Sequence, residues 1–313
     1  MSELFITGLG TYLPKRMVTN GELAALEPSR SLEEIERVGI RSRGWAGEDE
    51  GVLEMALSAA RAALSESGLA PAELDFLILA NWTERRYVPD FSPRIQRALG
   101  AQRAFAFDVC CACSGFLFAL SIAHGYLQNP RFSRGILIAA DRSAQRMRPG
   151  SRARLVFGDG AAAAVVERDA GRGGKLIDYE LRTDGSRNDI MDIAADGYLE
   201  PHIKQRELND LAGRSIAEVC RALLERNRLS LNDVDWIIPH SGTAGVQIMV
   251  AEHLQAPREK VLTNLIDVGN VTAASIPTAL HHFKQAGVVK PGSLILSASV
   301  GLGWQYAGAL YTS

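Results

Sequence analysis

A strand that turns directly into an apolar helix is the pattern of Phe107-Asp-Val-Cys-Cys-Ala-Cys-Ser-Gly-Phe-Leu-Phe-Ala-Leu120, and Cys113 lies at the turn. Residues 114–126 are apolar nearly all the way round, which predicts a buried helix. The first turn of a helix carries unpaired N–H groups and partial positive charge, which favour a thiolate. We therefore expect a nucleophilic Cys113 with a lowered pKa. The alternative is a small packing residue, because free cysteines are often buried.

The composition excludes several classes of protein. The 313 residues are 47% hydrophobic and can bury a large core, either as two domains or as one α/β unit. The 34 basic and 36 acidic residues leave a net charge of −2, so we expect neither nucleic acid nor membrane as a partner.

The cysteines and the apolar runs indicate the compartment. Three of the four cysteines cluster at 110, 111 and 113, without a C-x-x-C pair or nearby histidines. This spacing predicts neither a disulfide framework nor a structural zinc site. The N-terminal run Leu4–Leu9 looks like a strand and lacks a preceding basic region, and no apolar run reaches membrane-spanning length. We expect an intracellular, cytoplasmic protein.

The two halves of the chain repeat one another. A helical pattern at 56–69 is followed by a strand pattern at 73–79, and the same order returns at 216–229 and 233–239. Asp75 and Asp235 match at an offset of 160 residues, Phe107-Asp-Val109 matches Ile266-Asp-Val268 at 159, and 135–139 matches 292–296 at 157. An ordered series at nearly constant offset predicts two tandem α/β copies with helices over a mostly buried sheet.

A duplicated fold brings equivalent turns together near its centre. The cysteine turn of the first copy then faces the turn Gly269-Asn-Val-Thr-Ala-Ala-Ser-Ile-Pro277 of the second. His240 follows the strand pattern 234–239, and strand ends are where α/β proteins place ligands. Taken singly, His240 and Asn270 are equally compatible with structural roles. Their place at strand ends equivalent to that of Cys113 makes them candidates for chemistry.

These residues resemble the β-ketoacyl-acyl carrier protein synthase III family of thiolase-like condensing enzymes. The motifs that carry the resemblance run in family order along the chain: Gly8-Leu-Gly-Thr-Tyr-Leu-Pro14, Val38-Gly-Ile-Arg41, the cysteine turn, Phe157-Gly-Asp-Gly-Ala161, Pro239-His240, the Asn270 turn and Gly301-Leu-Gly303. The resemblance implies an α/β thiolase-like fold, with duplicated halves at 1–170 and 171–313 in five α-β-α-β-α layers. It also implies a homodimer.

The resemblance implies a triad of Cys113, His240 and Asn270. Cys113 would accept an acyl group as a thioester. His240 and Asn270 would bind the thioester carbonyl of a malonyl-type extender, and backbone N–H groups of Cys113 and Leu302 would form an oxyanion hole. The substrates would be thioesters of coenzyme A or of an acyl carrier protein, with no cofactor and no metal.

Several positions depart from the family pattern. A tryptophan that stacks on coenzyme A in the family is here Glu33, whereas the accompanying arginine is kept as Arg37. The family motif Pro-His-Gln-Ala-Asn is here Pro239-His-Ser-Gly-Thr243, and a basic carrier-docking residue falls on Gly245. These departures concern the acyl donor and leave the triad intact.

Arginines near the family's donor site are candidates for gripping a phosphate or carboxylate, because guanidinium groups form bidentate hydrogen bonds with both. A solvated loop is the alternative. The candidates are Arg37, Arg85, Arg86, Arg146, Arg148 and Arg152, in a region that also holds Arg142 and Arg154.

The function we predict is decarboxylative Claisen condensation in specialised metabolism. Asn270 favours it, because relatives that transfer acyl groups to hydroxyls can carry an acid there. Two alternatives remain open: an acyltransferase to oxygen, nitrogen or sulfur without decarboxylation, and a silent partner subunit of a condensing-enzyme heterodimer.

Overall fold

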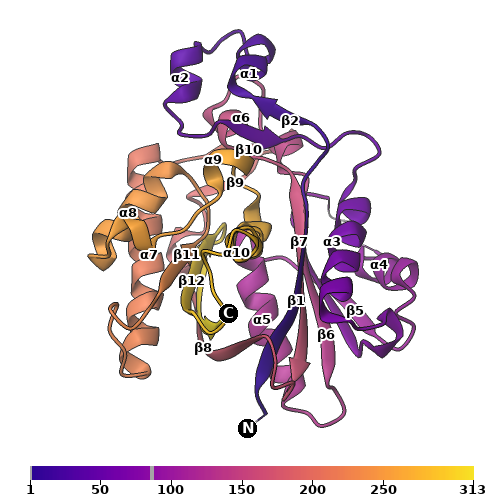
Figure 1. Ribbon diagram of the computed structural model, residues 1–313. Coiled ribbons are helices and arrows are strands. Elements are labelled where there is room, and N and C mark those ends of the chain that lie inside the picture. The colour runs from indigo at the N-terminus through magenta and orange to yellow at the C-terminus, as the bar shows by residue number, and fades with distance from the viewer. Residues whose placement is uncertain (1, 85–87) are drawn as a thin grey trace.

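The computed structural model describes residues 2–84 and 88–313, which form five alternating layers of helices and strands (Figure 1). The outer and central helices are α7 (Gln205–Arg226) and α8 (Ala244–Leu254) on one side, α3 (Val52–Ser67) and α4 (Ser92–Leu99) on the other, and α5 (Gly115–Leu127) and α10 (Ser275–Gln285) in the middle. The duplicated, five-layered α/β fold predicted from the sequence is confirmed.

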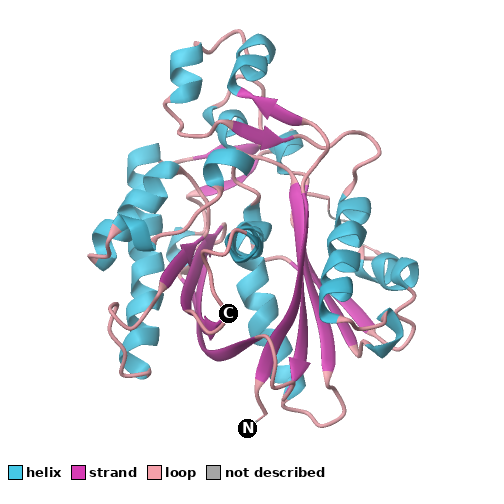
Figure 2. Ribbon diagram, viewed as in Figure 1, coloured by secondary structure: helices cyan, strands magenta, loops and turns pink. Residues whose placement is uncertain are grey.

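Nine strands of the described chain form one sheet in the order β11-β12-β13-β8-β1-β7-β6-β4-β5. The strands are β1 (Leu4–Tyr12), β4 (Phe76–Ala80), β5 (Phe105–Val109), β6 (Arg134–Asp141), β7 (Gly160–Arg168), β8 (Gly174–Thr183), β11 (Trp236–Pro239), β12 (Leu294–Gly301) and β13 (Gln305–Thr312). Figure 2 shows these strands curving around the central helices.

The pairing pattern of the first copy returns in the second. Strand β7 pairs antiparallel with both β1 and β6, and β4 pairs parallel with β6 and β5. Correspondingly, β13 pairs antiparallel with β8 and β12, and β11 pairs parallel with β12. The place of β5 is taken in the second copy by a single parallel bridge between Ile237 and Val261.

Strand β8 joins the two parts of the sheet. Its first residues, Gly174 and Lys175, pair with Ile6 and Phe5 of β1, and the rest of the strand pairs with β13. The predicted division at residue 170 falls in the turn between β7 and β8. This division stays a prediction.

One strand match of the two copies is wrong. Residues 107–109 belong to β5, whereas 266–268 belong to a short helix, α9 (Leu265–Val268). The reason is that Leu265 packs into a separate apolar cluster with Val18, Ile35 and Ile40. Asn270 therefore follows a helix and not a strand.

Glycines allow α3 to lie directly on β1. A Cβ atom at Gly8 would lie 2.3 Å from the Ala63 carbonyl oxygen, and one at Gly10 would lie 2.2 Å from that of Ala59. Because backbone atoms block both places, any side chain there would push the helix off the sheet. The alanine-rich helix ends at Gly68, whose φ is +74°.

A cap of short elements covers one end of the layers. It comprises β2 (Met17–Thr19), α1 (Asn20–Leu26), α2 (Leu32–Glu36), β3 (Ser42–Gly44), α6 (Arg152–Val156), β9 (Met191–Ile193) and β10 (Leu199–Pro201). Short 3-10 turns lie at Pro71–Glu73, Ala112–Ser114, Ser143–Arg146, Gly185–Arg187, Arg258–Lys260 and Thr272–Ala274. Among the described helices, none has the length and apolar character needed to cross a membrane.

Candidate active site

Cys113, His240 and Asn270 line one cavity of about 280 Å³ at the centre of the molecule. Cys113 lies in the 3-10 turn that precedes α5, and His240 directly follows β11. Asn270 lies two residues before the matching 3-10 turn that precedes α10. The structure thus brings together the three residues predicted from the two copies.

The cysteine turn is held by residues from both copies. The Ser114 hydroxyl donates to the Gln305 carbonyl oxygen at 2.7 Å, and the Ser114 N–H donates to the Cys111 carbonyl oxygen at 3.0 Å. Ala112 has a φ of +42°, a conformation that is uncommon without a glycine. The cysteine turn is therefore fixed by its backbone geometry and by a hydrogen bond to the first residue of β13.

Burial governs the titration of Cys113. Loss of solvation, together with a smaller contribution from the charge of Asp141, raises the pKa of this thiol to about 12, although a backbone hydrogen bond acts in the opposite direction. The expected lowering of the pKa at a helix start is thus wrong for the protein without substrate. The helix N-terminus is present, but burial outweighs it.

His240 is buried and held in place through its backbone. Its N–H donates to the Ala298 carbonyl oxygen at 2.8 Å, and its carbonyl oxygen accepts from the Gln247 amide at 2.8 Å. Burial lowers the pKa of the imidazole to about 4, against a smaller opposite effect of the Thr272 backbone. Nδ1 has no hydrogen-bond partner among the described residues. A neutral ring is therefore available to a bound substrate.

Asn270 is fixed at both its backbone and its side chain. Its N–H donates to the Val156 carbonyl oxygen at 2.9 Å, and its carbonyl oxygen accepts from the Gly158 N–H at 3.0 Å. The carboxamide oxygen accepts from the Thr272 N–H at 2.9 Å, and Nδ2 donates to the Gly242 carbonyl oxygen at 3.2 Å. One amide N–H remains for a substrate.

The rest of the cavity wall is mostly apolar. Sequence reasoning missed the following lining residues: Trp82, Ala153, Val156, Phe157, Met191, Leu199, Pro201, Ile203, Leu208, Ala212, Val246, Val300 and Trp304. Trp82 lies two residues after the end of β4, and the repeat does not match it to His240, because the offset of 160 residues pairs His240 with Ala80. Neither the repeat nor the sequence of β9, β10 and α7 indicated these lining residues. A mostly apolar cavity with a thiol in its wall suits the binding of an extended, uncharged acyl group.

The predicted oxyanion donors lie where the two copies meet. Leu302 lines the cavity together with Cys113 and Gly301. A Cβ atom on Gly301 would lie 3.1 Å from the nitrogen of Cys113, so only a glycine lets these backbones approach.

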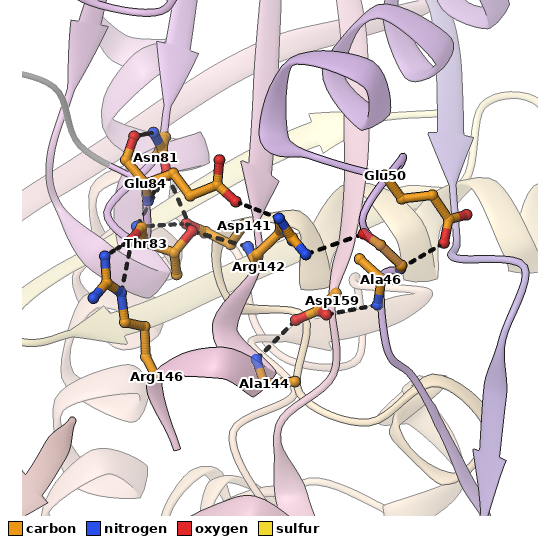
Figure 3. Close-up of polar contacts among 11 residues, drawn as sticks. Ala46, Glu50, Asn81, Thr83, Glu84, Asp141, Arg142, Ala144, Arg146 and Asp159 are labelled. Carbon is orange, nitrogen blue, oxygen red and sulfur yellow. Dashed lines mark hydrogen bonds and ion pairs between the residues drawn. The ribbon is translucent and has the colours of Figure 1, made fainter. Parts of the chain in front are cut away.

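Sequence reasoning missed a buried carboxylate, Asp141, which lies close enough to Cys113 to affect its pKa. Figure 3 shows Asp141 and several of its polar neighbours. Asp141, at the end of β6, accepts from the N–H groups of Trp82 and Thr83 at 3.0 and 3.3 Å, and from the Thr83 hydroxyl at 3.0 Å. It also accepts from the Thr272 hydroxyl. Burial raises its pKa to about 7 despite these hydrogen bonds. The sequence feature that could have indicated Asp141 is an acidic residue directly after the apolar run 135–140.

Two of the candidate arginines serve the protein itself. Arg146 donates from Nε and Nη2 to the Thr83 carbonyl oxygen at 2.8 and 2.5 Å (Figure 3). Arg148 forms an ion pair with Asp196 at 2.7 Å and lies over the ring of Tyr198. Neither lines the cavity.

Two neighbouring arginines are also engaged. Arg142 forms an ion pair with Glu84 at 3.1 Å, and Arg154 forms one with Glu27 at 3.1 Å.

Of the remaining candidates that the structure describes, Arg152 lies on the cavity wall and Arg37 does not. Arg152 is exposed and forms no ion pair within the described part of the chain. Arg37 is exposed on the cap and forms an ion pair with Glu33. Arg85 and Arg86 lie outside the described residues.

Gly245 lies where helix α8 packs against helix α7, and this contact leaves little room for a side chain. A Cβ atom on Gly245 of α8 would lie 2.0 Å from Nδ2 of Asn209 on α7. A basic side chain at this position would therefore have to displace the Asn209 side chain.

Fold and site together define a thiolase-like condensing enzyme. The family description "3-Oxoacyl-[acyl-carrier-protein (ACP)] synthase III" matches residues 107–185, and its "C terminal" counterpart matches residues 224–313. β-Ketoacyl-[acyl-carrier-protein] synthase III of Aquifex aeolicus (strain VF5) is 36% identical over 306 residues, covering 97% of this chain and 98% of that protein. The chain belongs to the β-ketoacyl-acyl carrier protein synthase III family.

Other relatives agree. The synthase of Cereibacter sphaeroides (strain ATCC 17025 / ATH 2.4.3) is 36% identical over 307 residues, covering 95% of each chain. The crystal structure of the Aquifex aeolicus VF5 synthase superposes with a TM-score of 0.93 over 99% of this chain and 100% of that one, at 36% identity. The priming β-ketosynthase of the R1128 polyketide pathway gives 0.91 over 99% and 96%, at 29% identity.

Proposed function

We propose that the protein condenses an acyl thioester with a malonyl-type thioester through Cys113. The Cys113 sulfur attacks the acyl carbonyl carbon, the new C–S bond forms, and the donor thiol leaves with a proton. The extender then loses carbon dioxide, and the electron pair of the broken C–C bond forms an enolate. This carbon attacks the acyl-enzyme, and the Cys113 thiolate leaves and is reprotonated.

The convergence of Cys113, His240 and Asn270 on one cavity is the observation that carries this proposal. A neutral His240 and the free N–H of Asn270 suit hydrogen bonding to the extender's thioester oxygen, where negative charge develops. The N–H groups of Cys113 and Leu302 take the oxyanion of the acyl-transfer steps. The reacting carbons come from the two thioesters, so the reaction as proposed needs no cofactor or metal.

The proposed donors are acyl thioesters of coenzyme A or of a carrier protein. The exposed Arg152 at the cavity wall supports a role in holding a donor phosphate. The changes at Glu33 and Gly245 support a role in specialised metabolism and not in general fatty acid initiation.

We also propose that two copies of the chain associate. Strand β5 is an edge of the sheet, and its aromatic residues Phe105 and Phe107 are only half-buried in the single chain. An open edge of this kind is a ready pairing surface.

Intact-protein mass spectrometry with a panel of acyl thioesters, alongside carbon dioxide release from a malonyl thioester, tests the proposed function. We expect a mass increase of one acyl group that disappears in Cys113→Ala, and carbon dioxide release that falls in Asn270→Ala. Acylation without carbon dioxide release by the wild-type protein would mean acyl transfer in place of condensation. A mass shift that persists in Cys113→Ala would rule out the assigned nucleophile.

A further inference from the structure

Thr272 has an unusual backbone conformation next to the triad. Its φ is +53°, a region that β-branched residues rarely adopt, and the residue is fully buried. Strained backbone of this kind persists only where surrounding contacts hold it. The question is what holds Thr272 and what the conformation achieves.

The hydroxyl of Thr272 is held by Asp141. Thr272 Oγ1 donates to Asp141 Oδ2, while the other carboxylate oxygen is fully used by Trp82 and Thr83. The Thr83 hydroxyl accepts from the Arg142 N–H at 2.9 Å, and its own proton has two acceptors within reach, Asp141 at 3.0 Å and the Asn81 side-chain oxygen at 3.3 Å. Figure 3 shows the part of this arrangement that Thr83, Asp141 and Arg142 form. Asp141 is thus a rigid acceptor.

The backbone of Thr272 in turn contacts the side chain of Asn270. The Thr272 N–H donates to the Asn270 carboxamide oxygen at 2.9 Å. That hydrogen bond fixes which end of the carboxamide is oxygen, so Nδ2 faces Gly242 and the cavity. Both hydrogen bonds disfavour the flipped side chain, which would present an oxygen where an N–H is needed.

We propose that Asp141 and Thr272 are positioning residues that orient the Asn270 amide for decarboxylation of the extender. The inference rests on the proposed function. Neither residue contacts substrate in this role; the first copy, through Asp141, sets the geometry of a residue in the second. Acylation of Cys113 does not use Asn270, so the two half-reactions should respond differently when the hydroxyl is removed.

The variant Thr272→Ala removes the hydroxyl, and the chain already carries alanine, Ala112, at the matching position with φ +42°. Thr272→Ser keeps the hydroxyl. The matched control is Thr278→Ala in α10, which removes another buried threonine hydroxyl, one bonded to the carbonyl oxygens of Ala274 and Ser275. Thr272→Gly is the second variant, because a positive φ is unstrained in glycine.

Carbon dioxide release and Cys113 acylation are measured separately on each folded variant. We expect Thr272→Ala and Thr272→Gly to lose about tenfold to a hundredfold in carbon dioxide release, as misplaced groups do. We expect their acylation to be unchanged, Thr272→Ser to restore release, and Thr278→Ala to affect neither.

Equal loss of both half-reactions, or undiminished release in Thr272→Ala and Thr272→Gly, would overturn the inference. Failure of both these variants to fold while Thr278→Ala folds would assign the hydroxyl a purely structural role and overturn it too. Acylation without any carbon dioxide release by the wild-type protein would instead overturn the proposed function, and this inference with it.

Discussion

Gly301 lies directly against the backbone of Cys113. A methyl group added to Gly301 would come within 3.1 Å of the Cys113 nitrogen and 2.6 Å of the Cys111 carbonyl oxygen. We therefore expect Gly301→Ala to shift the cysteine turn, reduce the rate of Cys113 acylation about tenfold or more, and lower the free energy of unfolding by about 1–3 kcal/mol.

The control for this variant is Gly125→Ala in α5, where an added Cβ meets no atom within 4 Å. We expect it to raise the free energy of unfolding by about 0.5–1 kcal/mol, the usual helical preference of alanine over glycine. Denaturant unfolding and mass spectrometry measure both effects. Normal acylation in Gly301→Ala would show that the turn tolerates displacement.

Asp141→Asn should make Cys113 a better nucleophile at moderate pH. Burial is the main cause of the high pKa of this thiol, and the charge of Asp141 adds to it. Removing that charge is expected to lower the pKa and to raise the rate of alkylation by iodoacetamide at pH 8. The rate is followed from pH 6 to 10, with Cys113→Ala identifying reaction at other thiols. A rate–pH curve identical to that of the wild-type protein would contradict a direct effect of the charge.

Decarboxylation should persist in mildly acidic solution. Burial lowers the pKa of His240 to about 4, so the ring stays neutral as the pH falls from 7 to 5. Protonation of His240 is therefore expected to reduce carbon dioxide release only as the pH approaches about 4. Asp141→Asn protein is assayed in parallel, because burial raises the pKa of Asp141 to about 7 and this group titrates within the same range. Folding is also monitored, because the unfolded state binds a proton at His240 more readily and the folded state is destabilised as the pH falls below the unfolded pKa. A decline centred near pH 6.5 in folded Asp141→Asn protein would refute a neutral buried ring.

Arg152→Ala should weaken the apparent affinity for phosphate-bearing acyl donors severalfold, because the side chain lies on the cavity wall without an ionic partner in the described ranges. Arg148→Ala is the matched control, since Arg148 comes from the same region but pairs with Asp196 at 2.7 Å. KM values for a coenzyme A thioester and for the corresponding pantetheine thioester, which lacks the phosphates, measure the effect. Equal losses for both donors would argue against phosphate recognition.

The sequence predicted the repeat and the meeting of Cys113, His240 and Asn270, because local patterns and nearly constant offsets encode them. The repeat was less reliable where the copies differ. Residues 266–268 are similar in sequence to the strand residues 107–109. They nevertheless form a helix, because Leu265 packs into the apolar cluster with Val18, Ile35 and Ile40.

Properties that depend on distant partners were not predictable from local patterns. The pKa of Cys113 reflects burial by both copies, and the arginines are engaged by residues far along the chain, such as Asp196 for Arg148. Asp141 and Thr272 lie 131 residues apart, and only the fold joins them.

The ladder of β8 restricts how a substrate enters. Because this strand is hydrogen-bonded to β1 at its beginning and to β13 along the rest, the two copies share a continuous backbone network. Separating the copies to admit a substrate would break these hydrogen bonds. The cap elements β9, β10 and α6 contribute residues to the cavity wall, so a substrate in the cavity lies against the cap as well as against the two copies.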